Sequence, residues 1–269
     1  MLRVYNHGPI IRLKMARTLF GRPLYIVQAY LMDGLLIDTG CPGTAGELLA
    51  WCRGQTVRQV VNTHHHEDHS GGDYWLQREL GLPIAAPEGA LPILRNFPHL
   101  EFYRRLVWGQ PRNLQVEPLG TTLETDRYQF LVVPTPGHSA DHVCLFEPRE
   151  GWLFSGDLFI HERARYIRRE EDARQILRSL KKVLELEPRL LFCAHAGVVE
   201  DAVGAIRRKI AYWENLATQA QDLAGKGLPL TEITRRLLGP ETLMTYLTGG
   251  DFSKQNLIAS LLAADGSDG

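Results

Sequence analysis

The sequence has few cysteines, no long apolar run and almost no net charge, and each of these absences excludes a class of protein. Its four cysteines, Cys41, Cys52, Cys144 and Cys193, form no CxxC pair, which argues against a disulfide framework and a cysteine zinc knuckle. No stretch approaches the roughly 18 apolar residues of a membrane span, and charges interrupt residues 1–15, unlike the core of a signal peptide. We therefore expect a cytoplasmic location and no membrane partner.

The charges are balanced, with 30 Lys and Arg residues against 31 Asp and Glu residues. This balance gives no global electrostatic reason to expect a nucleic acid or an anionic membrane as partner, although local patches stay open. Hydrophobic residues make up 44% of the 269 residues, enough to bury one large core, or one domain with an appendage. The composition is that of an ordinary globular protein.

Short β-rich runs alternate with helical stretches from residue 1 to about residue 196. Two strands are expected at 24–32 and 35–40, joined by a hairpin turn at Asp33 and Gly34. A short helix at 44–54 follows, and an amphipathic helix is expected within 169–186. Further strands are expected at 58–63, 81–87, 129–137, 142–148, 151–157 and 190–195. This mixture predicts a two-layer or four-layer α/β core.

The chain after residue 197 has a helical texture. Helices are expected at 210–227, at 231–239 with Thr231 as N-cap, and at 252–263 with Ser253 as N-cap. We find no internal repeat and no low-complexity linker, so these helices are expected to pack on the core, while the tail DGSDG is expected to fray. We divide the chain into a catalytic domain of residues 1–204 and a helical C-terminal extension of residues 205–269.

One stretch, VVNTHHHEDHSGG, concentrates four of the ten histidines between His64 and His69. It begins where a strand ends, and residues two apart in a strand point the same way, so His64 and His66 can reach one point in space. Asp68 and His69 can address a second point nearby once the chain turns into a helix. Imidazole and carboxylate suit zinc and its neighbours among the divalent cations. The stretch therefore predicts two half-built metal sites.

Three later motifs supply further candidate ligands, each at the end of a predicted strand. They are His138 in TPGHSADH, Asp157 in LFSGDLF and His195 in LFCAHAG. In isolation each has a plain structural interpretation, as a turn histidine, a helix N-cap and a core histidine respectively. Their joint occurrence at strand ends favours a site at the edge of a sheet, because strands hold position while loops leave room for a substrate.

Four residues near these motifs are placed outside the ligand set. His65 points away from its neighbours in a strand and is expected to support the site or the fold. His142 is interpreted mainly as structural, and Glu67 as solvated. Asp38, the acid that closes the strand LLIDTG, is either a turn residue or a hydrogen-bond partner of a ligand imidazole.

The motifs resemble those of the metallo-β-lactamase superfamily of hydrolases. The likeness rests on LLIDTG, THHHEDHSGG, TPGHSADH, SGD and AHAG, and covers about the first 200 residues. It implies a four-layer αββα sandwich with a helical extension and a dinuclear site at one edge of the sheets. By this resemblance the first metal is bound by His64, His66 and His138, the second by Asp68, His69 and His195, and both by Asp157.

The mechanism that the resemblance implies is hydrolysis by a hydroxide that bridges two divalent metal ions. Zinc is our first expectation for both ions, with iron or manganese as alternatives. Asp68 and Asp157 are the predicted catalytic residues, because their carboxylates can orient the water or pass its proton to the leaving group.

Four functions stay open for such a site. The first is cleavage of an ester, thioester or lactone of a small molecule, similar to glyoxalase II and the lactonases, although Ile160 stands where an acyl-homoserine-lactone lactonase is expected to have tyrosine. The second is a metal-dependent endoribonuclease or phosphodiesterase with a winged-helix-like C-terminal segment. The third is a true β-lactamase, which the lack of an export signal disfavours. The fourth is a binding module, which the open metal coordination disfavours.

Charge distribution disfavours the nuclease interpretation. The C-terminal cations Lys226, Arg235, Arg236 and Lys254 are matched by the acids Glu232, Glu241, Asp251 and Asp265. Phosphate backbones are usually bound by an excess of cations. We therefore expect a small-molecule substrate and no nucleic acid, and we leave a homodimer open.

The segment 91–113 is the expected specificity element. It is rich in aromatics, including Phe102, Tyr103 and Trp108, and it carries arginines that could fix an anionic end of a substrate. The alternative is a surface helix that packs its aromatics on the core. Residues 161–170 are expected to form the opposite rim.

Overall fold

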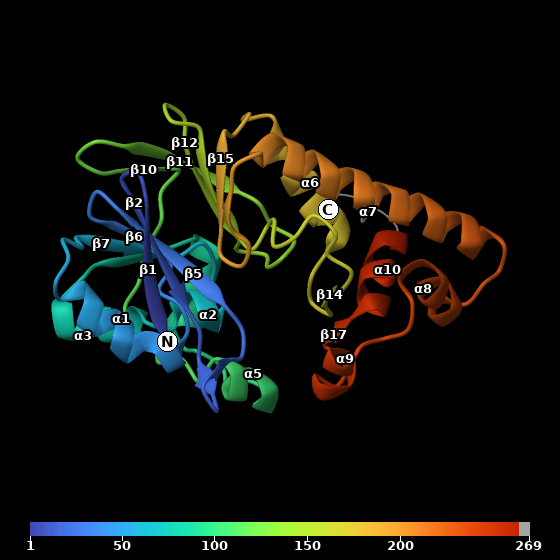
Figure 1. The fold of residues 1–269 in the computed structure, drawn as a ribbon, viewed down its shortest axis with the longest axis horizontal. Coiled ribbons are helices and arrows are strands. Elements are labelled where there is room, and N and C mark those ends of the chain that lie inside the picture. Colours follow the sequence, from blue (N-terminus) through green and yellow to red (C-terminus); the bar gives the residue numbers. More distant parts are fainter. Residues whose placement is uncertain (264–269) are drawn as a thin grey trace.

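Two β-sheets form the centre of the molecule in a computed structural model, which describes residues 1–263 (Figure 1). The first sheet has the strand order β1 (Leu2–His7), β2 (Ile10–Met15), β5 (Val27–Met32), β6 (Leu35–Ile37), β7 (Gln59–Val61), β8 (Ile84–Ala86) and β9 (Glu117–Pro118). The second has the order β10 (Thr122–Glu124), β11 (Gln129–Pro134), β12 (Val143–Glu147), β13 (Trp152–Gly156), β15 (Leu190–Cys193) and β16 (Gly197–Val199). Two short ladders complete the pairing, β3 (Thr18–Leu19) with β4 (Arg22–Pro23) and β14 (Ile167–Arg168) with β17 (Phe252–Ser253).

Helices cover the outer faces of both sheets. On the side of the first sheet lie η1 (Pro42–Thr44), α1 (Ala45–Cys52), α2 (Glu67–Ser70), α3 (Asp73–Leu80), η2 (Glu88–Ala90), α4 (Leu91–Arg95) and α5 (Phe102–Val107). On the side of the second lie α6 (Ala173–Leu184) and α7 (Ala202–Gly225), followed by α8 (Leu230–Leu238), α9 (Leu243–Leu247) and α10 (Lys254–Leu262). Among the described residues, no helix is long and apolar enough to cross a bilayer.

Buried apolar side chains form three layers that separate these elements. The layer between the two sheets contains Tyr30, Phe154 and Phe192, and the last two rings stack with their centroids 4.8 Å apart. One outer layer joins the first sheet to α1, α3 and α4, and the other joins the second sheet to α6 and α7. Helix, sheet, sheet and helix therefore follow one another as four layers, as the sequence analysis expected.

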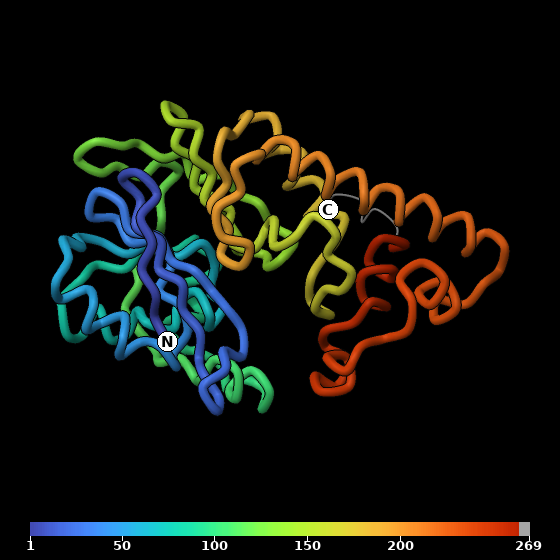
Figure 2. The backbone as a smooth tube through the Cα atoms, in the orientation of Figure 1, coloured from blue at the N-terminus to red at the C-terminus, as the bar shows by residue number. Residues whose placement is uncertain are grey.

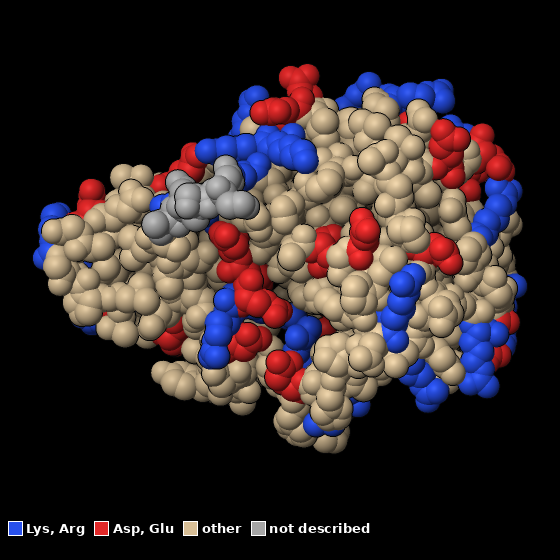
Figure 3. Space-filling model, turned by 180° about the vertical axis from the view of Figure 1, so that it is seen from behind, with Lys and Arg blue, Asp and Glu red and all other residues tan. Residues whose placement is uncertain are grey.

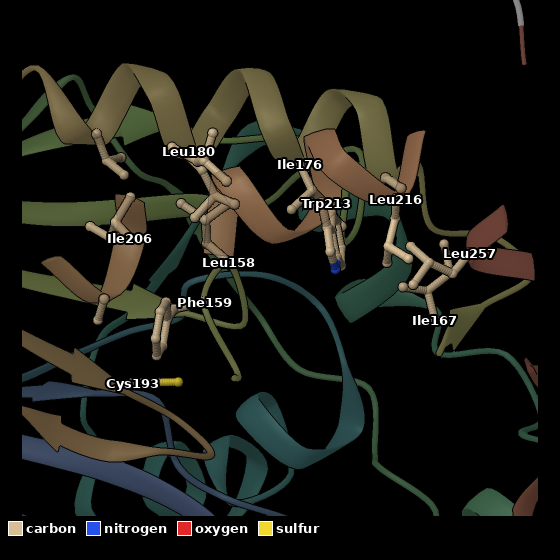
Figure 4. Packing of buried hydrophobic residues seen from close by; sticks show 14 of the residues in the cluster. Leu158, Phe159, Ile167, Ile176, Leu180, Cys193, Ile206, Trp213, Leu216 and Leu257 are labelled. Atoms are coloured by element: carbon tan, nitrogen blue, oxygen red, sulfur yellow. The ribbon is translucent and has the colours of Figure 1, made fainter. Parts of the chain in front are cut away.

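The C-terminal helices share the core of the second sheet. Trp213 and Leu216 of α7 and Leu257 of α10 lie in the same cluster as Ile167 and Ile176 (Figure 4). The chain turns back after α7, so that β17 pairs with β14 (Figure 2). Residues 252 and 253 therefore lie beside residues 167 and 168, in the segment that follows β13. The division of the chain at residues 204 and 205 stays a prediction.

Local sequence signals explain several element boundaries, but two expected helix starts are wrong. α7 begins at Ala202, eight residues before the helix expected at 210–227. Asp33 and Gly34 both adopt positive φ, +47° and +83°, as a tight hairpin between β5 and β6 requires. Ser253 caps α10 by accepting a hydrogen bond from the Asn256 amide. The prediction of Thr231 as an N-cap is wrong, because α8 begins at Leu230 after Pro229. The predicted fraying of residues 265–269 lies outside the described residues.

Candidate metal centre and substrate pocket

The histidine-rich motif lies in the turn between β7 and α3. β7 ends at Val61, and α2 begins at Glu67, so the chain turns into a helix at the second half of the motif, as expected. The glycines that close the motif allow close packing: a Cβ on Gly71 would lie 2.2 Å from Cδ of Pro42. The Gly71 amide donates to the Gly40 carbonyl, which fastens the motif to the loop after β6.

Three buried histidines form the first donor group. Nδ1 of His66 lies 3.0 Å from Nε2 of His64 and 3.0 Å from Nε2 of His138. His138 comes from the loop between β11 and β12, so the group joins the edges of both sheets. Burial, reinforced by neighbouring imidazoles, lowers the pKa of His64 and of His66 well below the ordinary histidine value. The rings of His64 and His66 are therefore neutral.

The second donor group contains two acids and two histidines, namely Asp68, His69, Asp157 and His195. Oδ2 of Asp157 lies 3.2 Å from Nε2 of His195, and Oδ1 lies 3.4 Å from Nε2 of His69. The same Oδ2 lies 3.3 Å from Nε2 of His138 in the first group. The Asp157 carboxylate therefore contacts donor atoms of both groups.

Charge distinguishes the second group from the first. Burial would lower the pKa of His69, but the surrounding carboxylates, Asp157 foremost, raise it well above the ordinary value. Burial would likewise raise the pKa of Asp157, but the facing imidazoles, His195 foremost, hold it well below its ordinary value. The second group is thus a cluster of strongly interacting charges, whereas His64 and His66 of the first group are neutral.

Hydrogen bonds on the outer side of the rings decide which nitrogen faces the centre. Nδ1 of His195 lies 2.7 Å from the Ile26 carbonyl, which can only accept, so this nitrogen carries the proton. Nδ1 of His69 lies 2.8 Å from Oδ2 of Asp38. In the neutral ring that a metal ion would require, the proton on Nδ1 leaves the lone pair of Nε2 directed inward, an arrangement typical of metal-ligating histidines.

Buried polar atoms without hydrogen-bond partners indicate whether the donor groups fit metal ions. Nε2 of His69 and Oδ1 of Asp157 have no hydrogen-bond partner among the described residues, although both are buried. Each donor group offers ligand atoms that lie within 4.8 Å of one another. A cation satisfies converging lone pairs that hydrogen bonds leave unpaired, so the residues fit two metal ions.

The neighbours of the donor groups differ in part from the sequence analysis. Glu67, expected to be solvated, is fully buried and paired with Arg104, whose Nε lies 2.8 Å from Oε1. The sequence interpretation failed because this partner lies 37 residues away. His65 contacts Asp141 at 2.8 Å, outside the donor groups as expected. His142, whose Nε2 accepts from the Asp157 amide at 3.1 Å, holds the loop of the central acid.

A cavity of about 110 Å³ opens beside the second donor group. Asp68, His138, Asp157 and His195 form one side of it. The other walls include Tyr25, Tyr103, Trp108, Tyr166, Arg168 and Phe252. The walls of this cavity are therefore largely aromatic, with one arginine among them, and a second cavity of about 560 Å³ shares Asp157 and His195 with it.

The two rims expected from the sequence both reach this cavity. Tyr103 and Trp108 come from the segment 91–113, whereas Phe102 is 73% exposed and points away. Arg168 comes from the opposite rim. The sequence analysis missed Tyr25, whose ring lies edge-on to both His195 and Trp108, with centroids 5.1 and 5.4 Å apart. No local signal marks Tyr25, because its neighbours in the site lie far along the chain.

Comparisons with known proteins agree with this geometry. The chain is 29% identical over 214 residues to a beta-lactamase-like protein 2 homolog of Drosophila melanogaster, covering 77% of this chain and 68% of the relative. It is 32% identical over 169 residues to a hydroxyacylglutathione hydrolase of Nitrosomonas eutropha, covering 60% of this chain and only 56% of that enzyme. A beta-lactamase domain protein from Burkholderia ambifaria has a similar fold, with a TM-score of 0.74, 17% identity and coverage of 96% of this chain and 87% of that one.

The family model described as the metallo-beta-lactamase superfamily matches residues 22–195. This match includes both donor groups, the central acid and most strands of the two sheets that hold them. Since it spans more than half of the sequence, the chain belongs to the metallo-beta-lactamase superfamily.

Proposed function

We propose that this protein is a dinuclear metal-dependent hydrolase that cleaves an ester, thioester or lactone of a small molecule. One observation carries the proposal: the Asp157 carboxylate lies within 3.2 to 3.4 Å of histidine nitrogens from both donor groups. A carboxylate that contacts both donor groups could bind two cations that lie close together. The similarity to a hydroxyacylglutathione hydrolase supports hydrolysis as the reaction class.

In this proposal the first ion is held by the three histidines and the second by Asp68, His69 and His195, with Asp157 between them. Zinc suits these imidazole and carboxylate donors best, with iron or manganese as alternatives. Two bound cations would lower the pKa of a water molecule toward neutrality and polarise a carbonyl oxygen.

The protein's own groups would orient the reactants. The Asp68 carboxylate borders the cavity, and its Oδ2 lies 3.6 Å from Nε2 of His195. We assign to Asp68 the acceptance of the proton from the attacking water and its delivery to the leaving oxygen or sulfur. The His142 ring fixes the Asp157 backbone, and Tyr25 packs against His195, so that Asp157 and the His195 imidazole stay in place.

The walls of the cavity favour a small-molecule substrate. They are largely aromatic and suit a partly apolar molecule. These features support carbonyl hydrolysis of a small molecule.

Three of the four C-terminal cations that a nuclease could use are engaged within the protein. Arg235 and Arg236 both donate to Glu232, and Lys254 is buried, donating to the carbonyls of Leu238 and Pro240. Basic and acidic side chains are interspersed over the face shown in Figure 3. A phosphate backbone requires free cations along its path, so we favour the small-molecule substrate.

Metal analysis coupled to a hydrolysis screen tests the proposal. Protein loaded with zinc should hold close to two ions per chain, and should turn over an ester, thioester or lactone faster than a β-lactam or a phosphodiester. A single bound ion would contradict the dinuclear assignment. Faster cleavage of RNA, with binding that falls steeply as salt rises, would establish the nuclease alternative instead. The cytoplasmic location and a homodimer stay predictions.

A further inference from the structure

Arg168 is a buried cation in the wall of the active-site cavity. It belongs to β14, where its backbone pairs with Phe252 of β17, and its guanidinium lies 5.1 Å above the Phe252 ring. Only 4% of the residue is exposed, yet it lines the same cavity as Asp157 and His195. Two segments more than eighty residues apart thus cooperate to place one positive charge there.

The guanidinium lacks the partners that a buried arginine usually has. Nε and Nη1 are buried, and neither has a hydrogen-bond partner among residues 1–263. The nearest carboxylate is that of Glu170, whose Oε1 lies 3.6 Å from Nη1 and whose side chain is 57% exposed. Leaving a buried charged donor unpaired is costly, so such donors in a cavity wall point to a ligand.

Other nearby carboxylates are already engaged with different groups. Glu67 is held by Arg104. Glu171 accepts from the backbone amide of Arg168 at 3.0 Å, and its Oε2 lies 3.4 Å from Nδ1 of His138. These contacts fix the backbone around Arg168 while leaving Nε and Nη1 free of hydrogen bonds.

No arginine of the segment 91–113 lines this cavity. Arg104 is committed to Glu67, and Arg95 donates to the Val116 carbonyl, 2.8 Å away. Neither lines the cavity, whereas Arg168 does. The expectation that an arginine of this segment fixes an anionic end is thus not met by these two residues.

We propose that Arg168 binds an anionic group of the substrate, a carboxylate or a phosphate, while the scissile carbonyl lies against Asp157 and His195. This inference rests on the proposed carbonyl hydrolysis at the same cavity and narrows its substrate to esters, thioesters or lactones that carry an acid group. The acid and the carbonyl would belong to one molecule, because Arg168, Asp157 and His195 line the same cavity. Arg168 acts in binding and selection and does not touch the reacting carbon.

Matched substrates and variants test the assignment. The zinc-loaded wild-type protein, Arg168→Met, Arg168→Lys and the control Arg169→Met are compared on a dicarboxylic acid monothioester, its neutral methyl ester and its phosphate-bearing analogue. Arg169 is the adjacent, exposed residue, and its side chain contacts the Gly249 carbonyl outside the cavity. The measured quantities are kcat/KM for each substrate and the thermal unfolding midpoint of each protein.

We expect wild type and Arg169→Met to prefer an anionic substrate by about 10-fold or more, because charge-assisted hydrogen bonds are strong in a buried site. Arg168→Met should lose this preference through a higher KM for the anionic substrate, and Arg168→Lys should recover part of it. Whichever anion is preferred identifies carboxylate or phosphate as the ligand.

Two results would overturn the assignment. One is a wild-type protein that does not distinguish anionic from neutral substrates. The other is an Arg168→Met protein that loses both activities equally, with a lowered unfolding midpoint, as for a purely structural residue. Failure of the proposed function looks different, since no thioester or ester would then be cleaved. In that case binding of succinate by wild type and Arg168→Met, measured by calorimetry, still tests Arg168: equal affinities would reject it and weaker binding by the variant would support it.

Discussion

The metal-donor groups and the cavity walls beside them are built in different ways. The donors follow strands β7, β11, β13 and β15, and outer hydrogen bonds such as those of His69 to Asp38 and His195 to Ile26 fix the rings. The walls come from short segments far apart in the chain, including Tyr25, Trp108 and Arg168. Under the proposed function, the sheets would position the groups that act in the reaction, whereas the loops and the segment around β17 would select the substrate. Each prediction below tests one side of this contrast.

The largest effect is expected for Asp157→Asn. The amide keeps the shape of the carboxylate but loses the charge that faces histidines of both donor groups. We expect activity to fall by on the order of 100-fold or more, since loss of one well-placed polar group already costs about that much. Metal content per chain and kcat, measured together, check this prediction.

Asp201→Asn serves as the control for that change. Asp201 caps α7 by accepting from the Gly204 amide and lies outside the donor groups. Its substitution should leave metal content and kcat at wild-type values. If Asp157→Asn also kept two ions and full turnover, the central role of this carboxylate would be refuted.

The next largest effect is expected for Asp38→Asn. Oδ2 of Asp38 lies 2.8 Å from Nδ1 of His69, and Oδ1 accepts from the Thr63 amide. Partners of this kind change metal affinity by roughly 10–100-fold when they are lost. We expect the weakening to be confined to one of two ions, because the contact is to the second donor group. A calorimetric zinc titration that shows both affinities unchanged would remove Asp38 from the site.

A wall residue should behave differently, and Trp108→Ala tests this. The indole is 5% exposed and packs edge-on against Tyr25 beside the cavity. Its removal should raise KM by about 10-fold through lost apolar contact, equivalent to about 1.4 kcal/mol, while zinc content stays at the wild-type value. Phe102→Ala, six residues earlier and 73% exposed, is the matched control and should change neither quantity. Loss of zinc from the Trp108→Ala protein would break the contrast between donors and walls.

The same contrast explains how much the sequence could predict. Alternation along a strand and the turn at α2 are local properties, so His64, His66, Asp68 and His69 could be predicted from their own stretch. Three later motifs at strand ends supplied His138, Asp157 and His195, and the seven residues converge. The burial of Glu67 could not be predicted, because it depends on Arg104. Arg168 and Phe252 could not be brought together either, since β14 and β17 lie more than eighty residues apart in the chain. Pairings across such separations leave no periodic signal along the chain.

Strand boundaries follow the same rule. The buried strand β5 has six buried residues in succession and is readily predicted. Most residues of β1 are exposed, so its own sequence does not mark it as a buried strand. It is recognised by its pairing with β2. A strand can therefore be predicted from the sequence when its own residues show that it is buried.

The smallest effect on activity is expected for a substitution of Asp73, a buried acid that lies outside the donor groups. It accepts from the Thr39 hydroxyl at 2.6 Å and from the Asn62 amide, and burial raises its pKa from 3.8 to about 7. Between these values the folded protein holds a proton that the unfolded chain has released. The free energy of unfolding should therefore fall as pH rises through this window, by on the order of 1.4 kcal/mol per pKa unit at most. Asp73→Asn resembles the protonated acid and removes this dependence. Urea unfolding of the metal-free proteins at pH 5 and pH 8 should show the variant gaining stability relative to wild type at the higher pH. A constant difference between the two proteins would mean that Asp73 is ionised in the fold.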